Sequence, residues 1–226
     1  TITSKLLDII LGVFWVTKIR EGAKGEGMHF PGPNSAKIAM DYGALNIHAK
    51  INVLGKEGTK FASDNGNLLE TTVGRIIFNE MLPVDYPYIN EEVGNGKMQT
   101  IVDDLIARYG VNDIAPILDK IKDFGFEQAT KSGTTWGIDD VIEPAGKQEI
   151  VDASRVKVAE IESQYSEGLI SDEERHRMII EVWHGTKGEV EKLIPATIDP
   201  KGSVYDMVTS GARGSLGQIT NMAGMK

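Results

Sequence analysis

The sequence predicts an α+β fold, with a mixed domain followed by a protruding antiparallel helical hairpin and a glycine-rich C-terminal helix or loop. Polar and apolar residues alternate over 45–54, as in a half-buried strand. Apolar residues recur with a helical period over 98–106 and again after Asp113. Beyond Gly146, mostly apolar residues recur with a heptad period on two successive arms, as along the contact line of two paired helices.

Residues 1–145 are predicted to contain short elements of both kinds. The apolar run over 6–16 indicates a buried strand or helix, because it is too short to span a bilayer. A Pro/Gly turn leads to a short helix that is capped at Asn34 or Ser35 and stops at Gly43. Further along we expect two strands over 67–83, with a turn or bulge at Gly74. A helix over 97–110 follows, and a second helix begins at Asp113 and has Pro116 in its first turn. A short strand and turn are expected over 134–144.

The hairpin is predicted from its seam and its turn. We expect helices near 147–166 and 171–194, each roughly 30 Å long at about 1.5 Å per residue. Gly168 is a helix stop, and Ser171 with Glu174 three residues later matches the capping box. So little neighbouring sequence is present to cover the hairpin that we expect it to protrude. The seam residues are Val151, Ser154, Val158, Ile161 and Tyr165 on the first arm and Ile179, Trp183, Thr186, Val190 and Leu193 on the second.

Composition limits the function. The chain has 226 residues, a net charge of -9 and no cysteine. Without cysteine there are no disulfides, thiolate metal sites or cysteine nucleophiles. The negative charge excludes an overall basic footprint for nucleic acid, so any contact with RNA, DNA or nucleotides must be local. The chain lacks an initiator Met and ends in a glycine-rich segment, so we expect it to be a piece of a longer polypeptide.

Few residues match a catalytic or metal-binding pattern. The four histidines, His29, His48, His176 and His184, have no partner at a metal-ligand spacing. His176 and His184 lie on the hairpin, where we expect them to face solvent. Adjacent carboxylates point in different directions on a helix or strand, so Asp103-Asp104 does not indicate a two-metal site. Asp139-Asp140 follows Gly137, which predicts a fixed turn.

Two glycine-rich stretches are weak candidates for phosphate binding. "AKGEGM" at 23–28 and "GARGSLG" at 211–217 match neither the P-loop nor the dinucleotide fingerprint. The first is interpreted as a turn. The second stays open, because the guanidinium of Arg213 and nearby backbone N–H groups could meet phosphate together.

The hairpin turn is rich in acids. A solvated charged face and a docking point for a basic partner both explain this composition. The acids concerned are Glu167, Asp172, Glu173 and Glu174.

Taken in order, several motifs resemble the middle of the bacterial RNA polymerase beta-prime subunit. They are "AKGEGM", "TTVGR", "KSGTTWGIDDV", the hairpin "VAEIESQYSEGLISDEERHRMIIEVW" and "SGARGSLGQITNMAGMK". The resemblance runs from Ile10 to Lys226. It implies that 1–145 is the pore domain, 146–195 the funnel or rim-helix hairpin of the secondary channel, and 196–226 the start of a truncated F-loop.

The resemblance also implies a function. The chain would be part of the subunit that transcribes DNA into RNA, lining the channel through which nucleotides arrive and backtracked RNA leaves. Arg213 and Gln218 would lie near nucleotide or RNA, and the acidic turn would dock channel-binding transcription factors. Implied partners are the beta, alpha, omega and sigma subunits, template DNA, RNA and nucleoside triphosphates, in a bacterial cytoplasm near the nucleoid and without a membrane.

One part of the family pattern is absent. No run like "DFDGD", the aspartate triad that holds Mg²⁺ in the family, occurs in this sequence. Catalytic residues are therefore expected outside this chain, and the chain alone is expected to be inactive. Two alternatives stay open, a stand-alone interaction module that uses the acidic hairpin and a small phosphate-binding enzyme.

Overall fold

The computed structural model describes residues 7–55, 60–61 and 68–225, which form two compact units. The N-terminal unit comprises 7–134, apart from the two gaps, together with 209–213. The hairpin unit comprises 135–208 and 214–225. Helices predominate, and three short strands form one mixed sheet within the described residues, so the predicted α+β class is confirmed. The domain boundaries implied by the resemblance stay a prediction.

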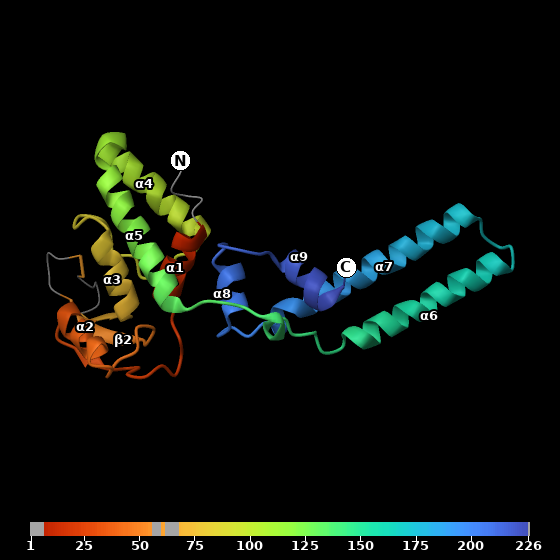
Figure 1. The fold of residues 1–226 in the computed structure, drawn as a ribbon, viewed down its shortest axis with the longest axis horizontal. Coiled ribbons are helices and arrows are strands. Elements are labelled where there is room, and N and C mark those ends of the chain that lie inside the picture. Colours follow the sequence, from red (N-terminus) through yellow and green to blue (C-terminus); the bar gives the residue numbers. More distant parts are fainter. Residues whose placement is uncertain (1–6, 56–59, 62–67, 226) are drawn as a thin grey trace. The chain divides into compact units, whose positions relative to one another are not determined.

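Five helices build most of the N-terminal unit: α1 (Leu7–Thr17), α2 (Pro33–Asp41), α3 (Val73–Met81), α4 (Asn95–Asp113) and α5 (Ala115–Ser132). The apolar N-terminal run is thus a helix, and the helices predicted near 35–42, 97–110 and after Asp113 are confirmed. The cap predicted at Asn34 or Ser35 was wrong, because α2 already begins at Pro33, a residue well suited to the first turn. Helix α1 packs against α5, beside which it lies in Figure 1. Gly110 adopts φ 75°, a left-handed conformation that kinks α4 where its helical pattern was predicted to end.

The sheet is small and has the order β1-β2-β3. Strand β1 (His29–Phe30) runs parallel to β2 (Ile51–Leu54), which pairs antiparallel with β3 (Leu68–Thr71). Apolar side chains of β2 and α3 share one core, and a second core joins α1, α3, α4 and α5. Both cores lie in the N-terminal unit.

Three predictions of strands were wrong. The strand predicted over 45–54 is confined to β2, because Asn46 Oδ1 accepts the His48 N–H and folds 46–49 into a turn. The second strand predicted over 67–83 is helix α3, which Thr72 caps by accepting the Arg75 N–H. Residues 138–140 form a short 3-10 turn instead of a strand. In that turn the Gly137 N–H donates to Asp140 Oδ2 at 2.7 Å, so the fixed turn predicted there is confirmed.

The hairpin unit contains the two predicted helices, α6 (Lys147–Ser166) and α7 (Asp172–Thr197). They run antiparallel side by side (Figure 1), and the seam is closed by a 2.7 Å hydrogen bond between Ser154 Oγ and Thr186 Oγ1. The polar residue that interrupts the predicted apolar seam therefore pairs with a hydroxyl on the facing arm. Gly168 adopts φ 75° just after α6, as expected of a helix stop.

The end of the chain is helical but broken by glycines, as predicted. Helix α8 (Ser203–Thr209), helix α9 (Leu216–Ile219) and a π-helical turn (Thr220–Gly224) follow α7. Ile194, Val204, Ile219 and Ala223 form a small core in the hairpin unit. Across the described residues, no helix combines the length and the apolar character that crossing a bilayer requires.

Candidate functional site

The turn between α6 and α7 carries the acidic tip, which we define as Glu167, Asp172, Glu173 and Glu174. All four residues are exposed. Glu174 completes the predicted capping box, since its carboxylate accepts the Ser171 N–H and its own N–H donates to Ser171 Oγ. Ser163 Oγ donates to Glu167 Oε1 at 3.0 Å. Glu174 and Glu167 therefore have local partners that help to shape the turn.

Arg175 connects the two arms at the tip. Its Nη2 atom lies 2.6 Å from Asp172 Oδ1, and its guanidinium carbon lies 4.5 Å from the centre of the Tyr165 ring on α6. The ring and the carboxylate together hold this cation and partly neutralise Asp172. Of the four acids, Glu173 is the one without a hydrogen bond or ion pair to any other residue that the structure describes.

The glycine-rich segment that contains Arg213 is fixed in the N-terminal unit. Ser210 and Ala212 are buried, whereas Gly211 and Arg213 are exposed. Ser210 O accepts the Asn95 N–H at 2.8 Å, and the Ala212 N–H donates to Ser210 Oγ at 3.2 Å. Arg213 forms no hydrogen bond or ion pair with the part of the chain that the structure describes. Its guanidinium is therefore available to an anion that approaches from solvent.

Gln218 lies in the hairpin unit and caps helix α9. Its Oε1 accepts the Ser215 N–H at 3.1 Å, while Ser215 Oγ accepts the Gln218 N–H at 3.3 Å. This is a second capping box, which sequence reasoning missed although Ser215 and Gln218 stand at the required spacing. The structure thus gives Gln218 a local role beside the ligand contact predicted for it.

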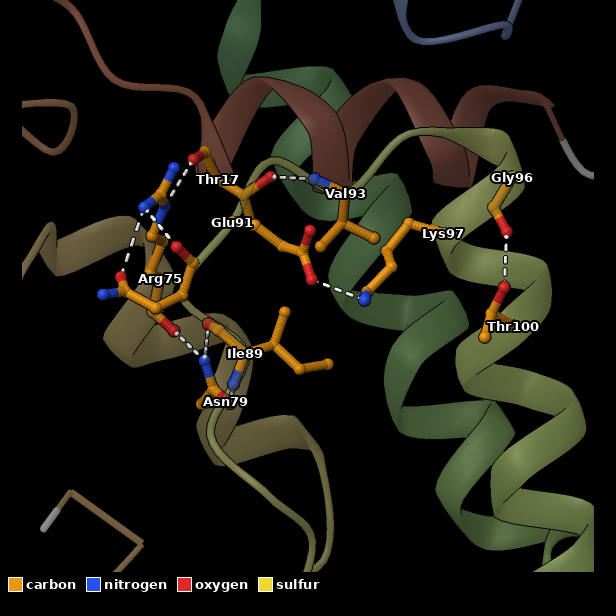
Figure 2. Close-up of polar contacts among 10 residues, drawn as sticks. Thr17, Arg75, Asn79, Ile89, Glu91, Val93, Gly96, Lys97 and Thr100 are labelled. Carbon is orange, nitrogen blue, oxygen red and sulfur yellow. Dashed lines mark hydrogen bonds and ion pairs between the residues drawn. The ribbon is translucent and has the colours of Figure 1, made fainter. Parts of the chain in front are cut away.

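A buried polar cluster connects the "TTVGR" motif with α1 and with the segment before α4 (Figure 2). Arg75 Nε donates to Thr17 O at 2.9 Å, and its Nη1 donates to Asn90 O at 2.7 Å. Asn79 brackets Ile89, since its Nδ2 donates to Ile89 O and its Oδ1 accepts the Ile89 N–H, both at 2.8 Å. Burial lowers the pKa of Arg75, and the Glu92 and Glu91 carboxylates act in the opposite direction. The residues of the motif did not by themselves predict this cluster, because its other members lie far away in the sequence.

Comparison with known proteins agrees with the resemblance that the motifs indicate. The family model RNA polymerase Rpb1, domain 3, matches residues 2–141. The chain belongs to this family. It is 38% identical over its whole length to the DNA-directed RNA polymerase subunit beta' of Nocardioides sp.. It is also 39% identical over its whole length to the subunit beta' of Acidothermus cellulolyticus, and 37% identical to that of Bacteroides thetaiotaomicron.

The chain covers a small share of these beta-prime relatives. It spans 18% of the length of the first two and 16% of the third. The resemblance found in the sequence is confirmed, because identity extends over the whole chain. The roles of Arg213, Gln218 and the acidic tip are not tested by these likenesses and stay predictions.

Among the described residues, no three histidine, aspartate or glutamate side chains come together. Asp104 pairs with Arg108, while Asp103 is exposed beside it, which fits the structural interpretation of that pair. His176 and His184 face solvent as predicted, and His48 is buried. We therefore derive no metal-dependent step from these residues.

The "AKGEGM" segment forms turns, as its interpretation predicted. Gly22, Gly25 and Gly27 have positive φ, and the Gly27 N–H donates to Lys50 O at 2.8 Å. Just before the segment, the Gly22 N–H donates to Glu26 Oε2 at 2.6 Å, so the carboxylate of the segment is paired with neighbouring backbone. This arrangement favours a structural role for the segment.

Proposed function

We propose that this chain is a section of the largest catalytic subunit of a DNA-directed RNA polymerase, which transcribes DNA into RNA. The observation that carries the proposal is the 38–39% identity to two bacterial beta' subunits over the whole of the chain. We expect the enzyme to work in the bacterial cytoplasm near the nucleoid.

In this proposal the 211–218 segment borders the secondary channel, through which nucleotides reach the active site and backtracked RNA leaves. Exposed Arg213 is the residue best suited to meet triphosphate or RNA phosphates, because a guanidinium donates several hydrogen bonds in a planar fork. Gln218 is the second residue proposed to face these ligands. The beta, alpha, omega and sigma subunits, template DNA and RNA are the proposed partners, and Mg²⁺ would be held by residues outside this chain.

The acidic tip is proposed to dock a basic transcription factor that binds in the channel. Glu173 is the natural contact point, since Asp172, Glu167 and Glu174 already have partners within the hairpin. Arg175, which contacts Tyr165 and Asp172, helps to hold the turn that presents this carboxylate. Complementary charge of this kind speeds association and selects the partner.

Substitution of Arg213 in the assembled polymerase tests the channel proposal. We expect Arg213→Ala to raise the KM for nucleoside triphosphates by about tenfold to 100-fold, because charge-assisted hydrogen bonds contribute about 1.5–3 kcal/mol. Arg213→Lys keeps the charge without the fork and should lie between. The matched control is Arg177→Ala, which removes an exposed arginine from α7. A KM and a rate of backtracked-RNA cleavage equal to those of the control would refute the role of Arg213.

A further inference from the structure

The backbone of residues 89–93, just before α4, is held by hydrogen bonds to side chains of α1 and α3. Asn79 of α3 binds both the N–H and the carbonyl of Ile89, and Arg75 binds the Asn90 carbonyl. Thr17 Oγ1 of α1 accepts the Val93 N–H at 3.0 Å, as Figure 2 shows. Thr17 and Asn79 are fully buried, and Arg75 is 6% exposed. Because buried polar groups are costly to leave unpaired, these contacts fix the segment firmly.

This fixed segment leads directly to the contact with the Arg213 loop. Gly94 ends the segment in an extended conformation, with φ -89° and ψ -171°, and Asn95 begins α4. The Asn95 N–H donates to Ser210 O at 2.8 Å. Gly211 follows with φ 71°, and a Cβ added there would lie 3.1 Å from Asn95 Cβ. The loop therefore fits closely against the first residue of α4.

We propose that the Asn95 N–H is a positioning group, which holds the Ser210 carbonyl and thereby sets the place of Arg213 three residues later. The part of this inference that concerns a phosphate ligand rests on the proposed function. The part that concerns the loop does not. The effect of Arg75, Asn79 and Thr17 is indirect. Their side chains fix residues 89–93, which lead to Asn95 at the start of α4.

Asn95→Pro removes this donor with little harm to the helix. Proline is well accepted at the first position of a helix, where the N–H has no partner within the helix. The extended conformation of Gly94 is also the one that a residue before proline prefers. The matched control is Gly96→Ala, since a Cβ at Gly96 meets nothing within 4 Å. Gly211→Ala is the second test variant, because its positive φ and the Asn95 contact make alanine unfavourable.

Cleavage by trypsin after Arg213 measures how often the loop opens, independently of any polymerase activity. Proteolysis of a folded protein tracks the population of the opened segment. We expect Asn95→Pro and Gly211→Ala to accelerate this cleavage in the full chain about fivefold, which is the effect of losing one ordinary hydrogen bond. Cleavage after Arg177 provides the internal reference, and circular dichroism checks that the helices are retained. Cleavage of both variants at the rate of Gly96→Ala would overturn the inference.

Kinetics of the assembled polymerase then test the coupling to Arg213. Asn95→Pro should raise the KM for nucleoside triphosphates with little change in kcat, and it should add nothing in an Arg213→Ala background. Full additivity of the two effects would overturn the positioning role. If Arg213→Ala itself leaves the KM unchanged, the proposed function of Arg213 fails, while the trypsin result still decides whether Asn95 holds the loop.

Discussion

At the scale of single residues, the four acids of the acidic tip differ in what they contact. Glu174 caps α7, Asp172 pairs with Arg175, and Glu167 accepts a hydrogen bond from Ser163. An acid that already serves the hairpin cannot be replaced without altering the turn. Glu173 has no such partner among the described residues, so its charge can be changed almost independently of the fold.

We predict that Glu173→Lys weakens the binding of a basic secondary-channel factor to the assembled polymerase by about tenfold, since like charges repel at a docking contact. The control Glu189→Lys makes the same change of charge on the same helix, about 24 Å along α7 at about 1.5 Å per residue. A titration of the factor against both variants measures the effect, with circular dichroism as the folding control. Equal affinity of the two variants would leave the acidic tip as helix-capping chemistry.

His48 illustrates how burial sets the charge of a residue. Its side chain is 2% exposed, its ring packs edge-on against Trp15, and its Nδ1 lies 3.1 Å from the Lys18 carbonyl oxygen. The tautomer with hydrogen on Nδ1 therefore donates to that carbonyl. Burial, reinforced by the nearby charge of Arg20, lowers the pKa of His48 to about 4. The imidazole is thus neutral in the folded protein at neutral pH.

Because the unfolded chain binds this proton more readily, the free energy of unfolding should fall as the pH drops from about 6.5 towards 4. Above the unfolded pKa the contribution is constant, and below the folded pKa it is fully lost. The loss should reach up to about 3 kcal/mol, at about 1.4 kcal/mol per pKa unit. Urea unfolding across this range measures it, and His48→Gln, which does not titrate, should show a correspondingly flatter dependence. Parallel curves for the two proteins would contradict the prediction.

At the scale of elements, glycine sets how closely two helices of the N-terminal unit approach. A Cβ at Gly12 of α1 would overlap the Gly125 carbonyl oxygen of α5 and come within 2.6 Å of Ala129 N. A Cβ at Gly125 would in turn lie 2.6 Å from Ile9 Cγ2. The two backbones are therefore in direct contact where α1 crosses α5. Gly74 plays the same part where α3 meets the carbonyl of Val16.

We predict that Gly12→Ala lowers the free energy of unfolding by about 1–3 kcal/mol or more, the usual range for overpacking. Gly188→Ala is the matched control within helix α7, where a Cβ meets nothing within 4 Å. That change should instead stabilise its helix by about 1 kcal/mol, since alanine has the higher helix propensity. Denaturant unfolding measures both values. A gain in stability for Gly12→Ala would show that α1 and α5 are less closely packed than the structure indicates.

At the scale of the whole molecule, the chain combines a packed N-terminal unit with an acidic hairpin unit. The net charge of the chain is -9, and the hairpin over 147–192 contributes eleven acids against seven basic residues. Neither unit assembles a group of three potential metal-ligating side chains among the described residues. Phosphoryl transfer by two metal ions requires such a group of carboxylates.

We therefore predict that the purified chain does not synthesise RNA from a template in the presence of Mg²⁺ and nucleoside triphosphates. Incorporation of labelled nucleotide is the measurement, and the assembled polymerase serves as the positive control. RNA synthesis by the chain alone would show that the chain itself holds the catalytic carboxylates. It would also favour the alternative of an independent enzyme.

The hairpin was predictable because the signals that form it are local. Ser171 and Glu174 stand three residues apart, and the Gly168 stop lies beside them. Helix α3 was not predictable in this way, since its run of apolar residues around Ile76 is also typical of a strand. The cap at Thr72 and packing against α1 decide in favour of a helix. Residues near 45–50 were wrongly predicted as a strand, because the turn that Asn46 forms also shows alternating polar and apolar residues.

From the sequence alone came the family, the α+β class, the hairpin with its capping box, and the candidate residues Arg213 and Glu173. These follow from motif order and from contacts between residues a few positions apart. The tertiary structure decided which acids of the tip are already occupied, and it revealed the link from Arg75 through Asn95 to the Arg213 loop. Thr17 and Val93 are 76 residues apart, and Asn95 meets Ser210 over a still longer separation. Periodicity and spacing carry no information about such pairs, because the folding of the whole unit brings them together.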